Sequence, residues 1–194
     1  MATSRKKMLR LLEESLENRT PVLVLRREVD AYRTEGIVIG LTSTWVVVLD
    51  LVDGVYPDGV VMLRLDLLRK VERSHKSDYI ERAHADLGVA PVPFGCQRDD
   101  TTRELLQAVE ARGGLMNVHL ELWNDGAMYL GKIRRVGQKR LDLQFINPNG
   151  VWDDWSDRWR LDRITRIECG GRYVEALEQW GDPVPAPPKT RVKR

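Results

Sequence analysis

Two stretches of nine residues carry most of the information about how this chain folds: residues 64–72 read RLDLLRKVE, and residues 160–168 read RLDRITRIE. A second match lies upstream of both, where residues 32–39 align with residues 127–134. Self-similarity at a fixed spacing is the sequence signature of repeated structural units. We therefore predict an internal tandem duplication with a period of about 95 residues.

The matches divide the 194 residues into two copies and a short remainder. Both copies end in a stretch that contains Gly and Pro, and each copy has about the length of a small domain. The predicted domains are therefore a first repeat over 1–95 and a second repeat over 96–188. Residues 189–194 follow a proline-rich run and contain four basic residues, so we expect a basic, flexible tail there.

Each copy predicts a helix, five short strands and a short helix. Thr101 and Glu104 have the spacing of a helix-capping box, and alternating apolar residues over 118–122 are typical of a strand that ends at an Asn124-Asp125-Gly126 turn. In the first copy the expected strands are 22–29, 35–41, 45–51, 60–65 and 68–71. Five short strands behind one helix close most economically into a small barrel. The predicted fold class is mainly β, with two tandem five-stranded antiparallel barrels, each preceded by an N-terminal helix and followed by a short helix.

Composition narrows the class of protein. The 31 basic and 29 acidic residues leave a net charge of only +2, which argues against a generally polybasic nucleic-acid binder. The apolar run 8–12 ends at Glu13, too short for an export signal, and no run reaches the length of a membrane span. Cys96 and Cys169 match no zinc or redox spacing. We expect a cytoplasmic protein, and the excess of Arg over Lys indicates a bacterial origin.

The pattern of the two copies resembles the Sm-like small β-barrels, within the larger group of Src-homology-type barrels. The resemblance rests on a Gly-x-apolar signature at 36–38 and 131–133 and on a Leu-Asp-x-apolar-x-x-apolar ending at 65–71 and 161–167. It implies an N-terminal helix followed by five bent strands.

The same resemblance does not bring an RNA pocket with it. Sm-like proteins recognise RNA with an Asp-x-x-Asn-type turn and a basic-glycine pair near the end. The corresponding turns here are Thr42-Ser43-Thr44 and residues 137–140, and neither copy has the terminal pair. The fold is therefore expected by resemblance, whereas the function is not.

The most unusual stretch is residues 152–160, which read WDDWSDRWR. Trp152, Trp155 and Trp159 have two interpretations. In the first, the rings form an exposed platform that binds a base, a cation or a partner's side chain. In the second, the rings pack on the mouth of the barrel or on the other copy and bury apolar surface. The sequence leaves both open.

Basic residues gather near the same stretch. The candidate contact residues for a partner or a nucleic acid are Trp152, Trp155, Trp159, Arg134, Arg135, Arg140, Arg158 and Arg160. The other interpretation of these cations is a solvated face that neighbouring carboxylates such as Asp142 neutralise.

Enzyme signatures are absent from the sequence, and His75, His84 and His119 have no ligand spacing. His119 is expected to point into solvent beside Glu121. We predict a non-enzymatic interaction protein that acts through protein contacts on the second repeat or through self-association, with no metal, no small-molecule cofactor and no membrane partner. The alternative is an Sm-like protein that binds RNA or DNA with the same aromatic and basic residues.

Overall fold

The structure, a computed structural model, describes residues 4–26, 33–123 and 128–192. It divides into two compact units, unit 1 (Met1–Asp99) and unit 2 (Asp100–Arg194), where the sequence predicts a boundary at 95/96. The predicted turn at 124–126 and the end of the first predicted strand lie outside the described residues. In the part that the structure describes, no helix is both long and apolar enough to cross a membrane.

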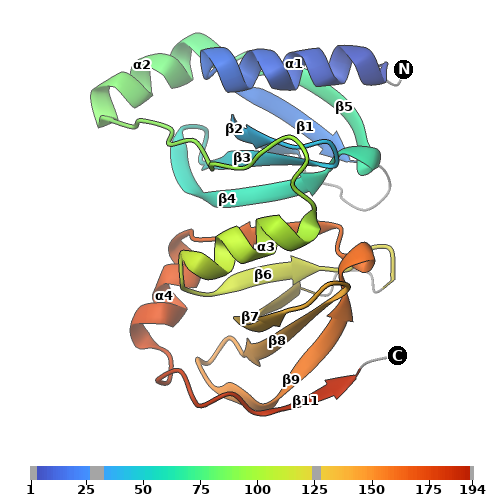
Figure 1. Cartoon of the computed structure of the whole chain (residues 1–194). Coiled ribbons are helices and arrows are strands. Elements are labelled where there is room, and N and C mark those ends of the chain that lie inside the picture. Colours follow the sequence, from blue (N-terminus) through green and yellow to red (C-terminus); the bar gives the residue numbers. More distant parts are fainter. Residues whose placement is uncertain (1–3, 27–32, 124–127, 193–194) are drawn as a thin grey trace. The chain divides into compact units, whose positions relative to one another are not determined.

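Unit 1 consists of a helix, five strands and a second helix (Figure 1). Its elements are α1 (Arg5–Asn18), β1 (Val22–Arg26), β2 (Thr34–Leu41), β3 (Trp45–Val52), β4 (Tyr56–Arg64), the 3₁₀ turn η1 (Leu65–Leu67), β5 (Leu68–Arg73) and α2 (Ser77–Leu87). The strands follow the order β4-β3-β2-β1-β5, with antiparallel neighbours. Residues 56–59 carry turn-forming Pro and Gly, yet they begin β4, because Tyr56 and Pro57 pair with the end of β3.

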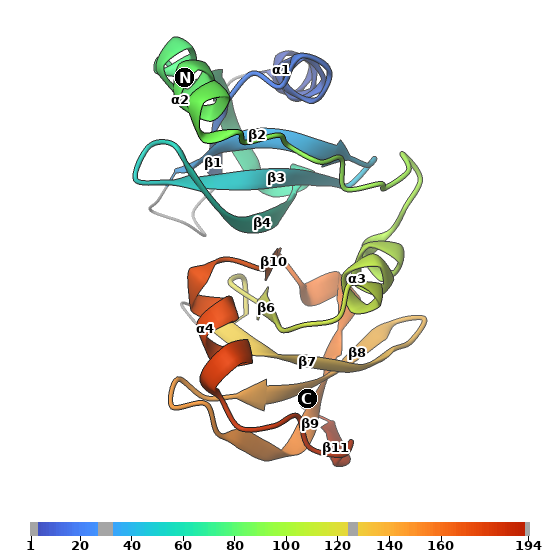
Figure 2. The same cartoon turned by 90° about the vertical axis from the view of Figure 1, so that its left-hand side faces the viewer.

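Unit 2 has the same succession of elements and one additional strand (Figure 2). Its elements are α3 (Thr102–Ala111), β6 (Met116–His119), β7 (Met128–Val136), β8 (Arg140–Ile146), β9 (Trp152–Arg160), the 3₁₀ turn η2 (Leu161–Arg163), β10 (Arg166–Cys169), α4 (Arg172–Trp180) and β11 (Lys189–Val192). The order is β11-β9-β8-β7-β6-β10. Composition predicts a flexible tail after residue 188, but β11 instead pairs in parallel with β9.

The prediction of two closed five-stranded barrels is wrong. The strands of each unit follow an open, unclosed order, and the parallel pairing of β11 with β9 makes that of unit 2 mixed. Within the described residues of unit 1, β4 and β5 lie at opposite ends of the strand order, and β5 pairs with β1. In unit 2, β8, β7 and β6 separate β9 from β10, and β10 pairs with β6. The physical reason is that η1 and η2 lead the chain from one edge of the unit to the other, so no ladder joins those two strands to close the sheet.

A glycine in each unit lets neighbouring strands approach closely. A Cβ atom at Gly36 would lie 2.2 Å from the carbonyl oxygen of Leu49, and one at Gly131 would lie 2.0 Å from that of Gln144. Register shifts between Val38 and Gly40 and between Ile133 and Arg135 then mark a bulge in each unit. Because bulges bend a strand and increase its twist, β2 and β7 curve around their cores at equivalent positions.

The core of unit 1 lies between α1 and the concave side of its strands. Met8, Leu11 and Leu12 of α1 pack on buried strand residues that include Val46 and Leu63. Ser15 on the same helix is buried, and its hydroxyl accepts a hydrogen bond from the Val38 amide and donates one to the Thr20 carbonyl. This hydroxyl fixes α1 to the bulge of β2.

In unit 2, α3 begins at its predicted capping box, and both α3 and α4 bury apolar side chains. The capping box of α3 is confirmed: the Thr101 side chain accepts from the Arg103 amide, and the Glu104 carboxylate accepts from the Thr101 amide. Leu105, Leu106 and Val109 are buried on this helix. On α4, Val174 and Leu177 pack in a cluster with Leu115, Leu130 and Ile146.

Candidate binding surfaces of the second unit

The tryptophan-rich stretch is a strand along its whole length, and its three rings have three different surroundings. Trp159 contacts Tyr129, with ring centroids 4.6 Å apart, and Phe145, with centroids 6.3 Å apart. Trp159 pairs with Leu141 in the strand register, as the buried Leu63 of unit 1 pairs with Val46. The Trp159 ring therefore packs against other side chains of unit 2.

Trp152 and Trp155 hold the C-terminal segment of the chain. Trp152 packs beside the α4 cluster, and its indole Nε1 donates a hydrogen bond to the Asp182 carbonyl oxygen at 2.9 Å. Trp155 is the most exposed of the three, with 43% of its surface accessible, and the Arg191 guanidinium lies 5.3 Å from its ring centroid. The rings thus do not form one flat platform.

Arg134 belongs to the same arrangement. Its guanidinium donates hydrogen bonds to the Gln144 side-chain oxygen and to the Pro185 carbonyl oxygen, the latter at 2.8 Å. It also lies 5.9 Å from the Trp152 ring centroid, and burial lowers the pKa of Arg134. Of the candidate residues, Trp152, Trp155 and Arg134 are therefore engaged with the protein's own residues 182–191.

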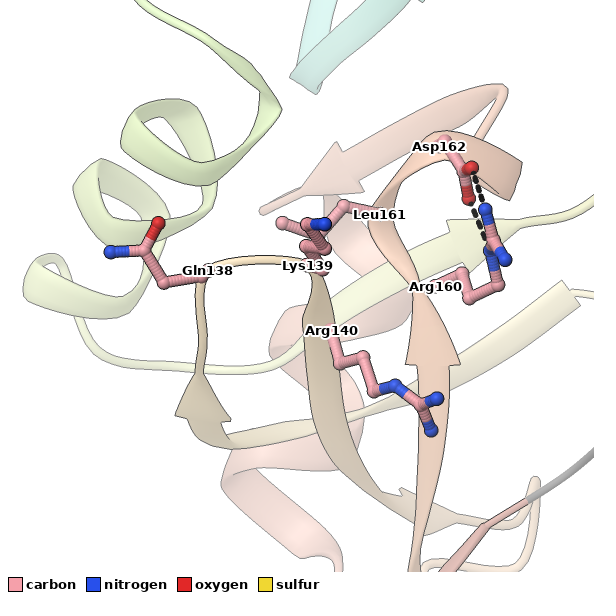
Figure 3. A pocket seen from close by; sticks show the side chains of 6 residues that line it. All are labelled: Gln138, Lys139, Arg140, Arg160, Leu161 and Asp162. Carbon is pink, nitrogen blue, oxygen red and sulfur yellow. Dashed lines mark hydrogen bonds and ion pairs between the residues drawn. The ribbon is translucent and has the colours of Figure 1, made fainter.

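The remaining five cations of this region surround two adjoining cavities at the other end of strands β7, β8 and β9. A cavity of about 440 Å³ is lined by Gln138, Lys139, Arg140, Arg160, Leu161 and Asp162 (Figure 3). A second, of about 300 Å³, is lined by Arg135, Gly137, Gln138, Lys139, Arg140, Asp142 and Arg158. Because Gln138, Lys139 and Arg140 line both, we treat the two as one site and call it the basic cavity.

Two carboxylates hold two of these cations in place. The Arg158 guanidinium donates to both oxygens of the buried Asp142, at 2.6 and 2.7 Å, and this hydrogen bonding raises the pKa of Arg158. Arg160 binds Asp162 in the same two-bonded manner, and this contact holds the pKa of the Asp162 carboxyl below its usual value. Figure 3 shows Arg160 bonded to Asp162, with Arg140 and Lys139 nearby.

The other three cations have no such partner. Arg135, Lys139 and Arg140 make no ion pair with any residue in the described part of the chain. Arg140 stands directly opposite Arg160 in the register of β8 and β9, which brings two like charges together. Five cations against two carboxylates leave the basic cavity with a formal charge of +3. No three His, Cys, Asp or Glu side chains of the described residues gather as a metal-ligand set.

Sequence reasoning missed a polar cluster on β6 and β10. His119, expected in solvent, is largely buried, and its Nε2 lies 3.4 Å from the Glu168 carboxylate. Asn117 donates to the same carboxylate at 3.2 Å, and Arg166 forms an ion pair with it. The expectation is wrong because the antiparallel pairing of His119 with Arg166 brings β10 residues alongside it, and the spacing of residues within β6 alone does not predict this pairing.

The Glu168 cluster predicts acid sensitivity. Burial alone would raise the pKa of Glu168, but hydrogen bonds and charges from His119, Arg166 and Asn117 outweigh it and lower the pKa from 4.5 to about 2. A carboxyl with a lowered pKa stabilises the fold fully above pH 4.5, and this stability is lost as the pH falls through about 2. We expect the free energy of unfolding to fall by about 3 kcal/mol over that interval, measured by urea titration at a series of pH values.

Glu168→Gln removes the titrating group and should flatten the stability curve between about pH 4.5 and pH 2. Glu110→Gln, at an exposed position of α3, is the matched control and should keep the wild-type curve. Equal curves for wild type and Glu168→Gln would contradict the assignment.

No protein-family model, no curated protein and no solved structure matches this chain. The resemblance to Sm-like barrels therefore stays a prediction.

Proposed function

We propose that the chain is a non-enzymatic interaction protein whose unit 2 binds an acidic segment of a partner protein at the basic cavity. The observation that carries the proposal is the set of three unpaired cations, Arg135, Lys139 and Arg140, which line a cavity beside two cations held in place by carboxylates. A guanidinium group binds a carboxylate in a two-bonded geometry, and no carboxylate of the described residues occupies those of Arg135 and Arg140.

The position of the aromatic rings favours a protein ligand over a nucleic acid. Proteins that bind single strands combine cations with rings on which bases stack. Here none of the described residues that line the basic cavity is aromatic. Trp152 and Trp155 contact the C-terminal segment, and Trp159 packs against Tyr129 and Phe145. A positively charged cavity without rings for base stacking favours a carboxylate-rich peptide as the ligand.

Charge reversal at the cavity tests the proposal. A fluorescein-labelled oligoglutamate peptide of about ten residues serves as the probe, and binding is followed by fluorescence anisotropy at low salt. The double variant Lys139→Glu/Arg140→Glu is expected to weaken binding at least tenfold, because like charges then face the ligand. Arg69→Glu, the same kind of change at an exposed residue of β5, is the matched control and should bind like the wild type.

A labelled single-stranded oligonucleotide forms the second arm of the experiment. If it binds more tightly than the acidic peptide, and the double variant abolishes that binding, the cavity is a nucleic-acid site and the proposal fails. The proposal also fails if the double variant retains the wild-type affinity for the peptide.

A further inference from the structure

The C-terminal segment lies on the outer edge of β9 as a short parallel strand (Figure 1). Lys189 pairs with Trp155, Thr190 with Ser156 and Arg191 with Asp157. The hydroxyls of Ser156 and Thr190 are 2.8 Å apart, and Arg191 Nε lies 3.2 Å from Asp157 Oδ1. The edge of β9 therefore offers a ladder, a hydroxyl, a carboxylate and an exposed ring to an extended chain.

Asp157 is unusual for its position in the fold. It pairs with Leu143, as Val61 of unit 1 pairs with Val48, so a carboxylate stands where the other unit has a core valine. Only 1% of Asp157 is accessible. Burying a carboxylate is costly unless a cation accompanies it, and an apolar residue would stabilise such a position better. The buried Asp157 carboxylate therefore favours, at the edge of β9, a strand that carries a positively charged side chain.

Only a few interactions hold β11 on the edge of β9. β11 is only four residues long, and parallel pairing is slightly less stable per residue than antiparallel pairing. The side chain of Arg191 remains 48% exposed although its partner is buried. The preceding residues 183–188 contain four prolines, which have no amide hydrogen to donate to a ladder.

We propose that the edge of β9 is a peptide-binding site for an extended segment of a partner protein that carries an arginine, and that the chain's own C-terminal strand occupies this site as an internal competitor. The arginine enters beside Asp157 and stacks on Trp155, and the backbone adds a strand to β9 by β-augmentation. This inference concerns a different surface from the basic cavity and does not depend on it.

A competition experiment on the full chain tests the inference. The probe is a fluorescein-labelled peptide that reproduces residues 182–192. The variant Arg191→Ala loosens the internal strand, so a larger fraction of molecules has a free edge. Since the apparent dissociation constant is the intrinsic one divided by that fraction, the variant should bind the probe about tenfold more tightly than the wild type. Lys189→Ala, in the same strand but without a carboxylate partner among the described residues, is the matched control and should resemble the wild type.

Two further measurements make the outcome decisive. A probe with alanine in place of its arginine should lose binding to Arg191→Ala, and Arg191→Ala/Asp157→Asn should lose binding to the original probe. Equal binding of the two probes, or no gain in Arg191→Ala, overturns the inference. If size-exclusion chromatography shows a concentration-dependent wild-type dimer that Arg191→Ala abolishes, the occupant is a second copy of the chain, and the partner-protein proposal is overturned.

Discussion

Replacing Gly131 with alanine is expected to lower the free energy of unfolding of unit 2 by about 3 kcal/mol or more. The added Cβ atom would lie 2.0 Å from the Gln144 carbonyl oxygen and 2.7 Å from its carbonyl carbon. Both atoms belong to the backbone of β8, so no side-chain rotation relieves the clash, and β7 must separate from β8. Guanidinium unfolding, followed by circular dichroism, measures the loss.

The control is Gly137→Ala in the turn after β7. There the nearest atom to the added Cβ is the Arg140 carbonyl oxygen at 3.3 Å, which a shift of a few tenths of an ångström relieves. We expect a change below about 1 kcal/mol. Comparable losses for both variants would mean that close approach of β7 and β8 is not what requires glycine at position 131.

Trp45→Ala is expected to destabilise unit 1 by about 3–5 kcal/mol. Trp45 begins β3, is 1% exposed, and its backbone amide donates to the Thr42 hydroxyl. Truncation removes the largest fully buried side chain among the described residues and leaves a cavity that strands fixed by two ladders cannot fill. The midpoint of guanidinium unfolding gives the change in stability.

Trp180→Ala removes the same side chain from the end of α4, where 75% of it is exposed. We expect its effect to stay within about 0.5 kcal/mol. If the two tryptophan variants lose stability equally, burial of the Trp45 ring does not account for its contribution.

Local features of the fold could be predicted from the sequence because their causes are local. The capping box of α3 needs only Thr101 and Glu104 at the right spacing. The alignment of Gly36 with Gly131 marks two positions where the structure shows the same close strand approach. Closure of the sheet could not be predicted in this way, since it depends on whether the fourth and fifth strands of a unit meet, and their hydrophobic patterns are the same in an open and a closed sheet.

The candidate site also combines features that the local sequence predicts with features that depend on strand pairing. Sequence proximity groups Arg135 with Arg140, and the structure places both, together with Lys139, around one cavity. It could not separate them from Arg158 and Arg160, because the pairing of Arg158 with Asp142 depends on the register between β8 and β9. Composition also predicts a flexible tail at the C-terminus of the chain, where the structure has β11. Local composition could not reveal this strand, because the buried partner of Arg191 lies 34 positions earlier in the chain.

The parallel strand β11 has one more consequence, for the colloidal behaviour of the protein. An uncovered strand edge presents a row of free amides and carbonyls that templates further strands and leads to aggregation. β11 covers this edge on β9. Proteolytic cleavage in the preceding proline-rich residues would release the cover, and the truncated chains would then add to one another edge to edge and leave solution.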